Sequence, residues 1–300
     1  MAESPPYRCR RDARHESVQL RDLEIHLRRW GPTATPDRPA LYCLHGWLDC
    51  GDTFQFMVDE FASERPVVAI DWRGFGRSAW AQGEYAFTDY VADLDALLQL
   101  YSPEAPVMLL GHSMGANVAC LYAGVRPERV RCVINLEGFG LPPSDPSQSV
   151  KRARQWLKEL KGTPSFNDYE SFEQLAAAIS RRHPRIAPAR ARHLAGIWAY
   201  ADEQGRVRLW GDPRHKRVFP TLYRREESEA VWREISAPML ALAGEQSSYI
   251  AQWPEGNALE AFRGCVPGCI VKVIQEAGHL LHLEKPESIA PLIEAFLDAH

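Results

Sequence analysis

The chain has 300 residues, of which 45% are hydrophobic and 25% charged, a balance typical of a globular protein with a sizeable core. Its net charge of −4 at pH 7 argues against the basic surface that nucleic-acid binding or an anionic membrane requires. No stretch has the roughly 18 successive apolar residues of a membrane span, and charge follows Met1–Arg8 where a secretory signal would be apolar. We therefore expect a cytoplasmic protein with no nucleic-acid and no membrane partner.

The first half of the chain alternates strands and helices. Residues 1–16 are polar and arginine-rich, and we expect a loose leader. Alternating apolar residues from Ser17 predict an opening antiparallel hairpin. Short apolar runs without alternation are typical of parallel strands covered on both faces, and they separate amphipathic helices. These strands are Ala40–Leu44, Pro66–Ile70, Pro106–Leu110 and Val130–Leu136, and the helices are Thr53–Ala62 and Asp89–Tyr101, the second capped by Thr88.

The rhythm of strands stops between residues 144 and 235. Helical patterns rich in aromatic residues replace it, which predicts a helical cap inserted between two strands. Strands return at Pro238–Gly244 and Ile270–Ile274, and a helix over Pro286–Ala299 closes the chain. The pattern predicts an α/β core of residues 17–143 and 236–300, with a mostly parallel sheet. Cap aromatics that we expect to offer an apolar pocket are Trp156, Trp198, Trp210, Phe219, Tyr223 and Trp232.

The strongest motif is Gly111-His112-Ser113-Met114-Gly115, which stands between a predicted strand and a predicted helix. A Gly-x-Ser-x-Gly motif in this context is a nucleophile elbow, a strained turn that exposes the serine hydroxyl. A serine hydroxyl needs a base within hydrogen-bond reach. His279, in a loop after the last strand, is the predicted base, and His282 is the alternative. We prefer His279 because it lies in a loop, whereas His282 falls at the start of a predicted helix.

An oxyanion forms when the serine attacks a carbonyl, and it needs donors that are fixed in advance. The elbow itself offers the backbone N–H of Met114. His45-Gly46 follows a neighbouring parallel strand, and a sharp turn there would present the N–H of Trp47. We predict that Trp47 and Met114 form the oxyanion hole.

Four motifs in this order resemble the α/β-hydrolase superfamily, in particular its serine-hydrolase-like esterases. They are His45-Gly46-Trp47-Leu48-Asp49, Asp71-x-Arg73-Gly74-x-Gly76-x-Ser78, the elbow, and Gly278-His279-x-x-His282-x-Glu284-x-Pro286. The resemblance covers roughly residues 17–300. It implies an eight-stranded sheet with helices on both faces and a helical cap over the site, and a structural rather than catalytic role for the turn at 71–78.

The acid of the triad departs from the family pattern. Relatives have Gly-x-x-Asp after the strand that follows the cap, whereas this chain has Gly244-Glu245-Gln246-Ser247. Glu137 ends the strand before the cap, and a branch resembling haloalkane dehalogenases uses a glutamate there. We therefore predict Glu137 as the acid, with Glu245 as the alternative. The serine at the elbow argues against dehalogenase and epoxide hydrolase chemistry, which requires a carboxylate nucleophile.

The sequence predicts a serine esterase that cleaves small, mainly apolar esters or lactones through Ser113, His279 and Glu137. Two alternatives remain open: a C–C bond hydrolase or lyase on the same fold, and a ligand-binding protein whose triad has decayed. We expect a monomer or homodimer without metal or cofactor. The seven cysteines are scattered and odd in number, which favours reduced thiols. Cys265 and Cys269 lack the second pair that a metal site would need.

Overall fold

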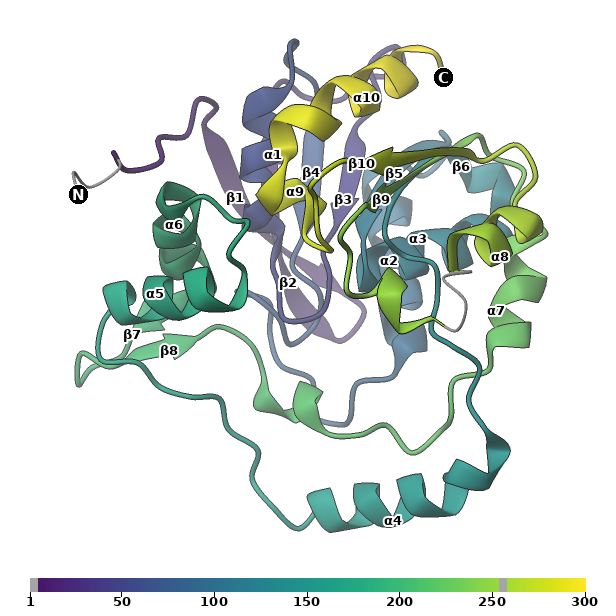
Figure 1. Ribbon diagram of the computed structural model, residues 1–300. Coiled ribbons are helices and arrows are strands. Elements are labelled where there is room, and N and C mark those ends of the chain that lie inside the picture. Colours follow the sequence, from purple (N-terminus) through teal and green to yellow (C-terminus); the bar gives the residue numbers. More distant parts are fainter. Residues whose placement is uncertain (1–4, 254–257) are drawn as a thin grey trace.

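A single sheet of eight strands forms the centre of the computed structural model, which describes residues 5–253 and 258–300 (Figure 1). The strand order is β1-β2-β4-β3-β5-β6-β9-β10. Strand β2 is antiparallel to β1 and to β4, and the remaining neighbours are parallel, as predicted. The strands are β1 (Ala13–Leu20), β2 (Leu23–Trp30), β3 (Leu41–Leu44), β4 (Val67–Ile70), β5 (Val107–His112), β6 (Val130–Leu136), β9 (Met239–Gly244) and β10 (Ile270–Ile274).

Helices cover both faces of this sheet because its central strands are apolar on both sides. In β3, Leu41 and Cys43 enter one buried cluster, whereas Tyr42 and Leu44 enter the other. The cluster that contains Tyr42 and Leu44 is covered by four helices: α2 (Phe87–Tyr101), α3 (Met114–Val125), α7 (Arg225–Trp232) and α8 (Ala258–Cys265). The cluster that contains Leu41 and Cys43 is covered by α1 (Gln55–Glu60), α9 (Leu281–Glu284) and α10 (Pro286–Asp298).

The segment between β6 and α7 departs from the sheet and forms the cap. It consists of α4 (Ser149–Glu159), α5 (Phe172–Arg182), α6 (Pro188–Trp198), β7 (Ala199–Ala201) and β8 (Val207–Leu209). Helices α5 and α6 share a small core with Phe56 and Leu283, whereas α4 stands apart from them (Figure 1). Strands β7 and β8 form a two-stranded hairpin apart from the main sheet, which the sequence analysis missed because each strand is only three residues long.

Several boundaries differ from the sequence predictions, and two of the differences change what was expected of a residue or segment. Strand β1 begins at Ala13 instead of Ser17, and Tyr7 of the expected loose leader donates a hydrogen bond to Asp59 (2.6 Å). Helix α2 begins at Phe87, so Thr88 lies inside it and is not its cap. Instead, the carboxylate of Asp89 in the first turn accepts a hydrogen bond from the backbone N–H of Ala86 (3.3 Å), the residue that precedes the helix.

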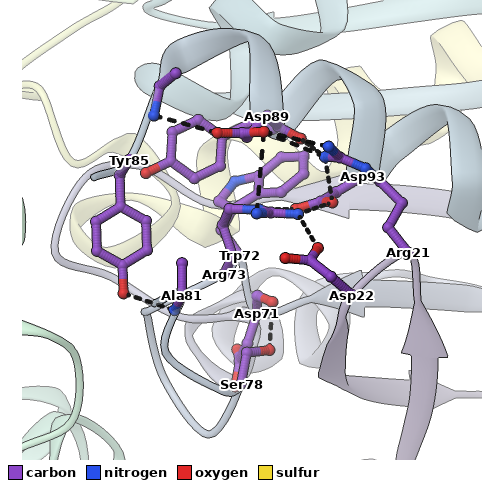
Figure 2. Close-up of polar contacts among 12 residues, drawn as sticks. Arg21, Asp22, Asp71, Trp72, Arg73, Ser78, Ala81, Tyr85, Asp89 and Asp93 are labelled. Carbon is purple, nitrogen blue, oxygen red and sulfur yellow. Dashed lines mark hydrogen bonds and ion pairs between the residues drawn. The ribbon is translucent and has the colours of Figure 1, made fainter. Parts of the chain in front are cut away.

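The turn at residues 71–78 is a structural junction. The buried guanidinium of Arg73 pairs through two nitrogens with the carboxylate of Asp93, both at 2.6 Å (Figure 2). Asp71 accepts hydrogen bonds from the N–H groups of Gly51 (2.6 Å) and Arg77 (2.9 Å), and Ser78 donates to its carbonyl (2.6 Å). These contacts tie the end of β4 to α2 and to the loop before α1.

Candidate active site

The elbow holds Ser113 in a strained conformation between β5 and α3. Its φ is +50°, a region that residues with a side chain rarely adopt. The flanking glycines permit this turn: a Cβ on Gly111 would lie 2.4 Å from backbone atoms of Ala116, and one on Gly115 would lie 2.1 Å from the carbonyl oxygen of Leu44. Ser113 is consequently presented, half-buried, at the carboxyl edge of the sheet.

His279 connects Ser113 to Glu137. It lies in the loop after β10, and its Nε2 is 3.0 Å from Oγ of Ser113. Its Nδ1 is 2.6 Å from Oε2 of Glu137. A neutral imidazole in this position accepts the serine proton at Nε2 while Nδ1–H donates to the carboxylate, which is the arrangement of a Ser-His-acid triad.

Glu137 is fully buried directly after β6, with a φ of +58° that turns its side chain back over the sheet edge. Its Oε1 accepts a hydrogen bond from the N–H of Gly244 (2.6 Å). Its Oε2 accepts another from the hydroxyl of Ser247 (2.5 Å) in addition to the contact with His279. A buried carboxylate needs such donors, and here both come from the end of β9 and the loop after it.

The two alternative site residues lie elsewhere. Glu245 is exposed, and its carboxylate accepts a hydrogen bond from the N–H of Glu276 (3.1 Å). His282 is buried on α9, and its Nε2 faces Asp49 (3.4 Å) and Thr53 (3.5 Å). The geometry therefore favours Glu137 and His279 for the acid and the base.

The loop after β3 brings its backbone beside the nucleophile. A Cβ on Gly46 would lie 3.3 Å from Cβ of Ser113, so only a glycine leaves space there. His45 fixes the turn: its Nδ1–H donates to the carbonyl of Gly46 (2.7 Å), and its Nε2 accepts from the N–H of Trp72 (3.0 Å). Burial lowers the pKa of His45, which keeps this neutral tautomer.

The N–H groups proposed for the oxyanion hole are free to serve a ligand. Met114 begins α3, where the first N–H groups have no partner within the helix. Within the described part of the chain, the N–H of Trp47 likewise donates to no protein acceptor. The indole of Trp47 is half exposed, and its backbone N–H, not its side chain, is the predicted donor.

A cavity of about 50 Å³ lies between the oxyanion loop and the cap. Two of the predicted pocket residues, Trp198 and Trp210, line it together with Leu48, Asp49, Cys50, Gly76, Phe166 and Leu209. The indole N–H of Trp198 donates to Asp49 (2.8 Å) and so joins the cap to the core. The cavity is small and largely apolar, apart from the Asp49 carboxylate.

The other aromatic candidates lie outside this cavity. Trp156 is on the distant α4, and Phe219 is an exposed loop residue. The hydroxyl of Tyr223 lies against Gly140, where a Cβ would be 2.5 Å from it. Trp232 belongs to the core and packs on Phe262 at a ring distance of 5.0 Å. Aromatic composition alone did not distinguish a pocket wall from packing.

Three residues around the triad were not predicted to have a role. Ser247 supports Glu137, as described above. The ring of Tyr249 packs on His279 with centroids 5.0 Å apart, and its hydroxyl donates to the carbonyl of Gly140. Asn117 donates to the carbonyl of Ser113 (3.0 Å) and accepts from the N–H of Gly140 (2.9 Å). The serine in place of the expected Asp was the one sequence signal for any of them.

Comparison with known proteins identifies the family. The family model of the alpha/beta hydrolase fold matches residues 39–286, which include the elbow, Glu137 and His279. The chain belongs to the α/β-hydrolase fold family. Among the described residues, no helix is long and apolar enough to cross a membrane.

Relatives of this α/β-hydrolase are named as hydrolases. It is 26% identical over 290 residues to a serine hydrolase-like protein of Danio rerio, covering 91% of this chain and 85% of the relative. It is 24% identical over 262 residues to the 2-(acetamidomethylene)succinate hydrolase of Mesorhizobium japonicum, covering 87% and 88%. The thioesterase domain from the curacin biosynthetic pathway has the same fold, with a TM-score of 0.83, 24% identity and coverage of 95% and 99%.

Proposed function

We propose that this protein is a serine-dependent acyl hydrolase that cleaves small, mainly apolar carboxylic esters or lactones. The observation that carries the proposal is the position of His279, whose two ring nitrogens face the Ser113 hydroxyl (3.0 Å) and the buried Glu137 carboxylate (2.6 Å). Such an arrangement activates a serine. Membership of the α/β-hydrolase fold family supports a hydrolase.

The proposed reaction has two stages. Oγ of Ser113 attacks the ester carbonyl while Nε2 of His279 takes its proton, and the N–H groups of Trp47 and Met114 stabilise the oxyanion. The C–O bond to the leaving alcohol then breaks, and His279 returns the proton to that oxygen. Water attacks the acyl-enzyme with His279 as base and releases the acid and the free Ser113. Glu137 orients the imidazole and stabilises its cationic form.

The preference for a small substrate rests on the cavity beside the oxyanion loop. Its volume of about 50 Å³ is sufficient for only a short acyl or alcohol group, and Phe166, Trp198 and Leu209 make its wall largely apolar. Hydrolysis of p-nitrophenyl esters should therefore fall steeply as the acyl chain grows. A rate that is indifferent to chain length would contradict a small pocket of this kind.

A panel of esters, lactones and thioesters, assayed with the wild type and with Ser113→Ala, tests the proposal. We expect ester or lactone turnover that is lost in the variant, and covalent labelling of Ser113 by a fluorophosphonate. Labelling without turnover of any of these substrates would favour C–C bond cleavage or a lyase reaction. Failure to label, with small-molecule binding retained, would indicate a binding protein instead.

A further inference from the structure

A second cluster of titratable side chains lies beneath the triad, and the proposed hydrolysis does not use it. It consists of Asp49 from the oxyanion loop, His112 from the end of β5, and His282 on α9, all of them buried. One possible ligand atom from each lies within 4.8 Å of the other two. The imidazole rings of His112 and His282 are 4.4 Å apart.

Both histidines keep a nitrogen without a protein partner. The Nε2 of His112 lies 2.9 Å from the carbonyl oxygen of His279, so it carries the proton and its Nδ1 has a free lone pair. The Nδ1 of His282 is also buried without a hydrogen bond. Buried polar atoms in folded proteins usually have partners, and two such nitrogens in one cluster with a carboxylate indicate a missing ligand.

We propose that Asp49, His112 and His282 form a binding site for a divalent transition-metal ion, with Zn²⁺ as the best match. Two imidazoles and one carboxylate suit Zn²⁺, which binds nitrogen at about 2.0–2.1 Å and oxygen at about 2.0–2.2 Å in tetrahedral sites. This geometry requires the ligand atoms to approach one another to about 3.3 Å. The fourth position falls to water or to the hydroxyl of Thr53, which is 3.1 Å from Asp49.

The groups around the cluster match those that surround metal ligands. A ligating histidine usually donates its other N–H to a carbonyl or carboxylate, as His112 does to His279. Trp198 likewise donates to Oδ1 of Asp49 (2.8 Å), which leaves Oδ2 toward His282. The absence of a side chain at Gly46 leaves space beside Nδ1 of His112, because a Cβ on Gly46 would lie 2.9 Å from that nitrogen. Asp49 also lines the cavity between the oxyanion loop and the cap, which is the side from which an ion would enter.

The site goes beyond the proposed function, because no step of ester hydrolysis passes through it. Its ion would act on the triad through His112, whose Nε2–H donates to the carbonyl of His279 (2.9 Å). The structure therefore assigns it a positioning role for the loop of His279. Metal uptake is measurable whether or not the protein hydrolyses esters.

Metal binding to the full-length protein tests the proposal. Zn²⁺ uptake is measured by equilibrium dialysis and elemental analysis, and Co²⁺ serves as the spectroscopic probe because a cysteine ligand would add a thiolate charge-transfer band. The variants are Asp49→Asn and His282→Gln, each checked for cooperative thermal unfolding. Cys9→Ser is the matched control, because Sγ of Cys9 lies 3.8 Å from Nε2 of His193 and offers a competing surface site.

We expect about one ion per chain, a tetrahedral Co²⁺ spectrum without a thiolate band, and affinity reduced at least about tenfold in both variants but unchanged in Cys9→Ser. No uptake by the wild type, a thiolate band, or equal affinity in the variants would overturn the proposal, as would loss of binding in Cys9→Ser. If one variant does not fold, the other variant and the wild-type Co²⁺ spectrum still decide.

Discussion

The hydroxyl of Ser247 lies 2.5 Å from Oε2 of Glu137, the same oxygen that faces Nδ1 of His279. Ser247 occupies the position where relatives were expected to carry the acid, in the loop after β9. Glu137 follows β6, which is the parallel neighbour of β9 in the sheet. Because neighbouring parallel strands end at the same edge, a carboxylate from β6 reaches the histidine while a small donor after β9 supports it.

Replacement of Glu137 by Gln should lower kcat by about 10³–10⁴ while the fold remains intact. The amide keeps the shape of the side chain but loses the negative charge that orients and stabilises the His279 cation. Steady-state kinetics with a p-nitrophenyl ester measures the effect, and thermal unfolding verifies the fold.

Glu245→Gln is the matched control for this change, because Glu245 was the alternative acid and is exposed. Its turnover should stay close to that of the wild type. Normal turnover in Glu137→Gln, or a large loss in Glu245→Gln, would show that the acid has been assigned to the wrong residue.

Removal of the Ser247 hydroxyl should destabilise the protein. In Ser247→Ala the buried Glu137 carboxylate loses one of its donors, which costs about 1.5–3 kcal/mol for a hydrogen bond to a charged group. Urea unfolding at neutral pH measures the loss. Ser247→Thr, which keeps a hydroxyl, should recover most of the stability; an equal loss in both variants would trace the effect to packing instead of the hydrogen bond.

The sequence predicted the order of the core elements because each leaves a local signal. Strand β6 has the predicted bounds Val130–Leu136, since most of its residues are apolar and the charged residues Arg129 and Glu137 flank it. The positions of Ser113 and His279 followed from the same logic, because both lie in loops after parallel strands. The role of Glu137 was harder to predict, because its proximity to His279 depends on which strands are neighbours in the sheet.

Features that depend on tertiary contacts were not readable from the sequence. Trp198 and Trp232 look alike as aromatic residues near helix ends, yet one lines the cavity and the other packs in the core. The three residues of the proposed metal site, Asp49, His112 and His282, come from three segments that are far apart in the chain. The local sequence pattern does not show that these distant segments come into contact.

A methyl group at Gly46 should impair catalysis. The Cβ of Gly46→Ala would lie 2.9 Å from Nδ1 of His112 and 3.3 Å from Cβ of Ser113, so the oxyanion loop must shift. A displacement of about 1 Å costs on the order of 10² in kcat. Gly83→Ala, at a site with nothing within 4 Å, is the control and should behave as the wild type. Full activity in Gly46→Ala would show that the loop tolerates movement.

Arg73→Ala should reduce stability by about 3 kcal/mol, because it leaves the fully buried Asp93 without its bidentate partner. Arg21 also contacts Asp93 (3.1 Å) but is 37% exposed, so Arg21→Ala should cost under about 1 kcal/mol. Urea unfolding of both variants measures the difference. Equal losses would mean that the turn at 71–78 does not depend on the buried pair.

Acid should weaken the fold through His215, which stacks between Phe75 (3.7 Å) and Tyr85 (3.8 Å) where the cap meets the core. Burial lowers the pKa of His215 from 6.5 to about 4. As the pH falls below 6.5, the unfolded chain therefore takes up a proton on His215 before the folded protein does. The contribution of His215 to the free energy of unfolding is constant above that pH and declines toward pH 4. Burial also lowers the pKa of His45 and of His112, which adds to the decline.

His215→Phe isolates the contribution of this residue, because the ring still stacks but no longer titrates. The loss of unfolding free energy between about pH 7 and pH 4.5 should be roughly 2–3 kcal/mol smaller in the variant than in the wild type. Urea unfolding at the two pH values measures both losses. The same pH dependence in the two proteins would mean that His215 takes up its proton over the same pH range in the folded and unfolded states, and that its burial does not exclude the charge.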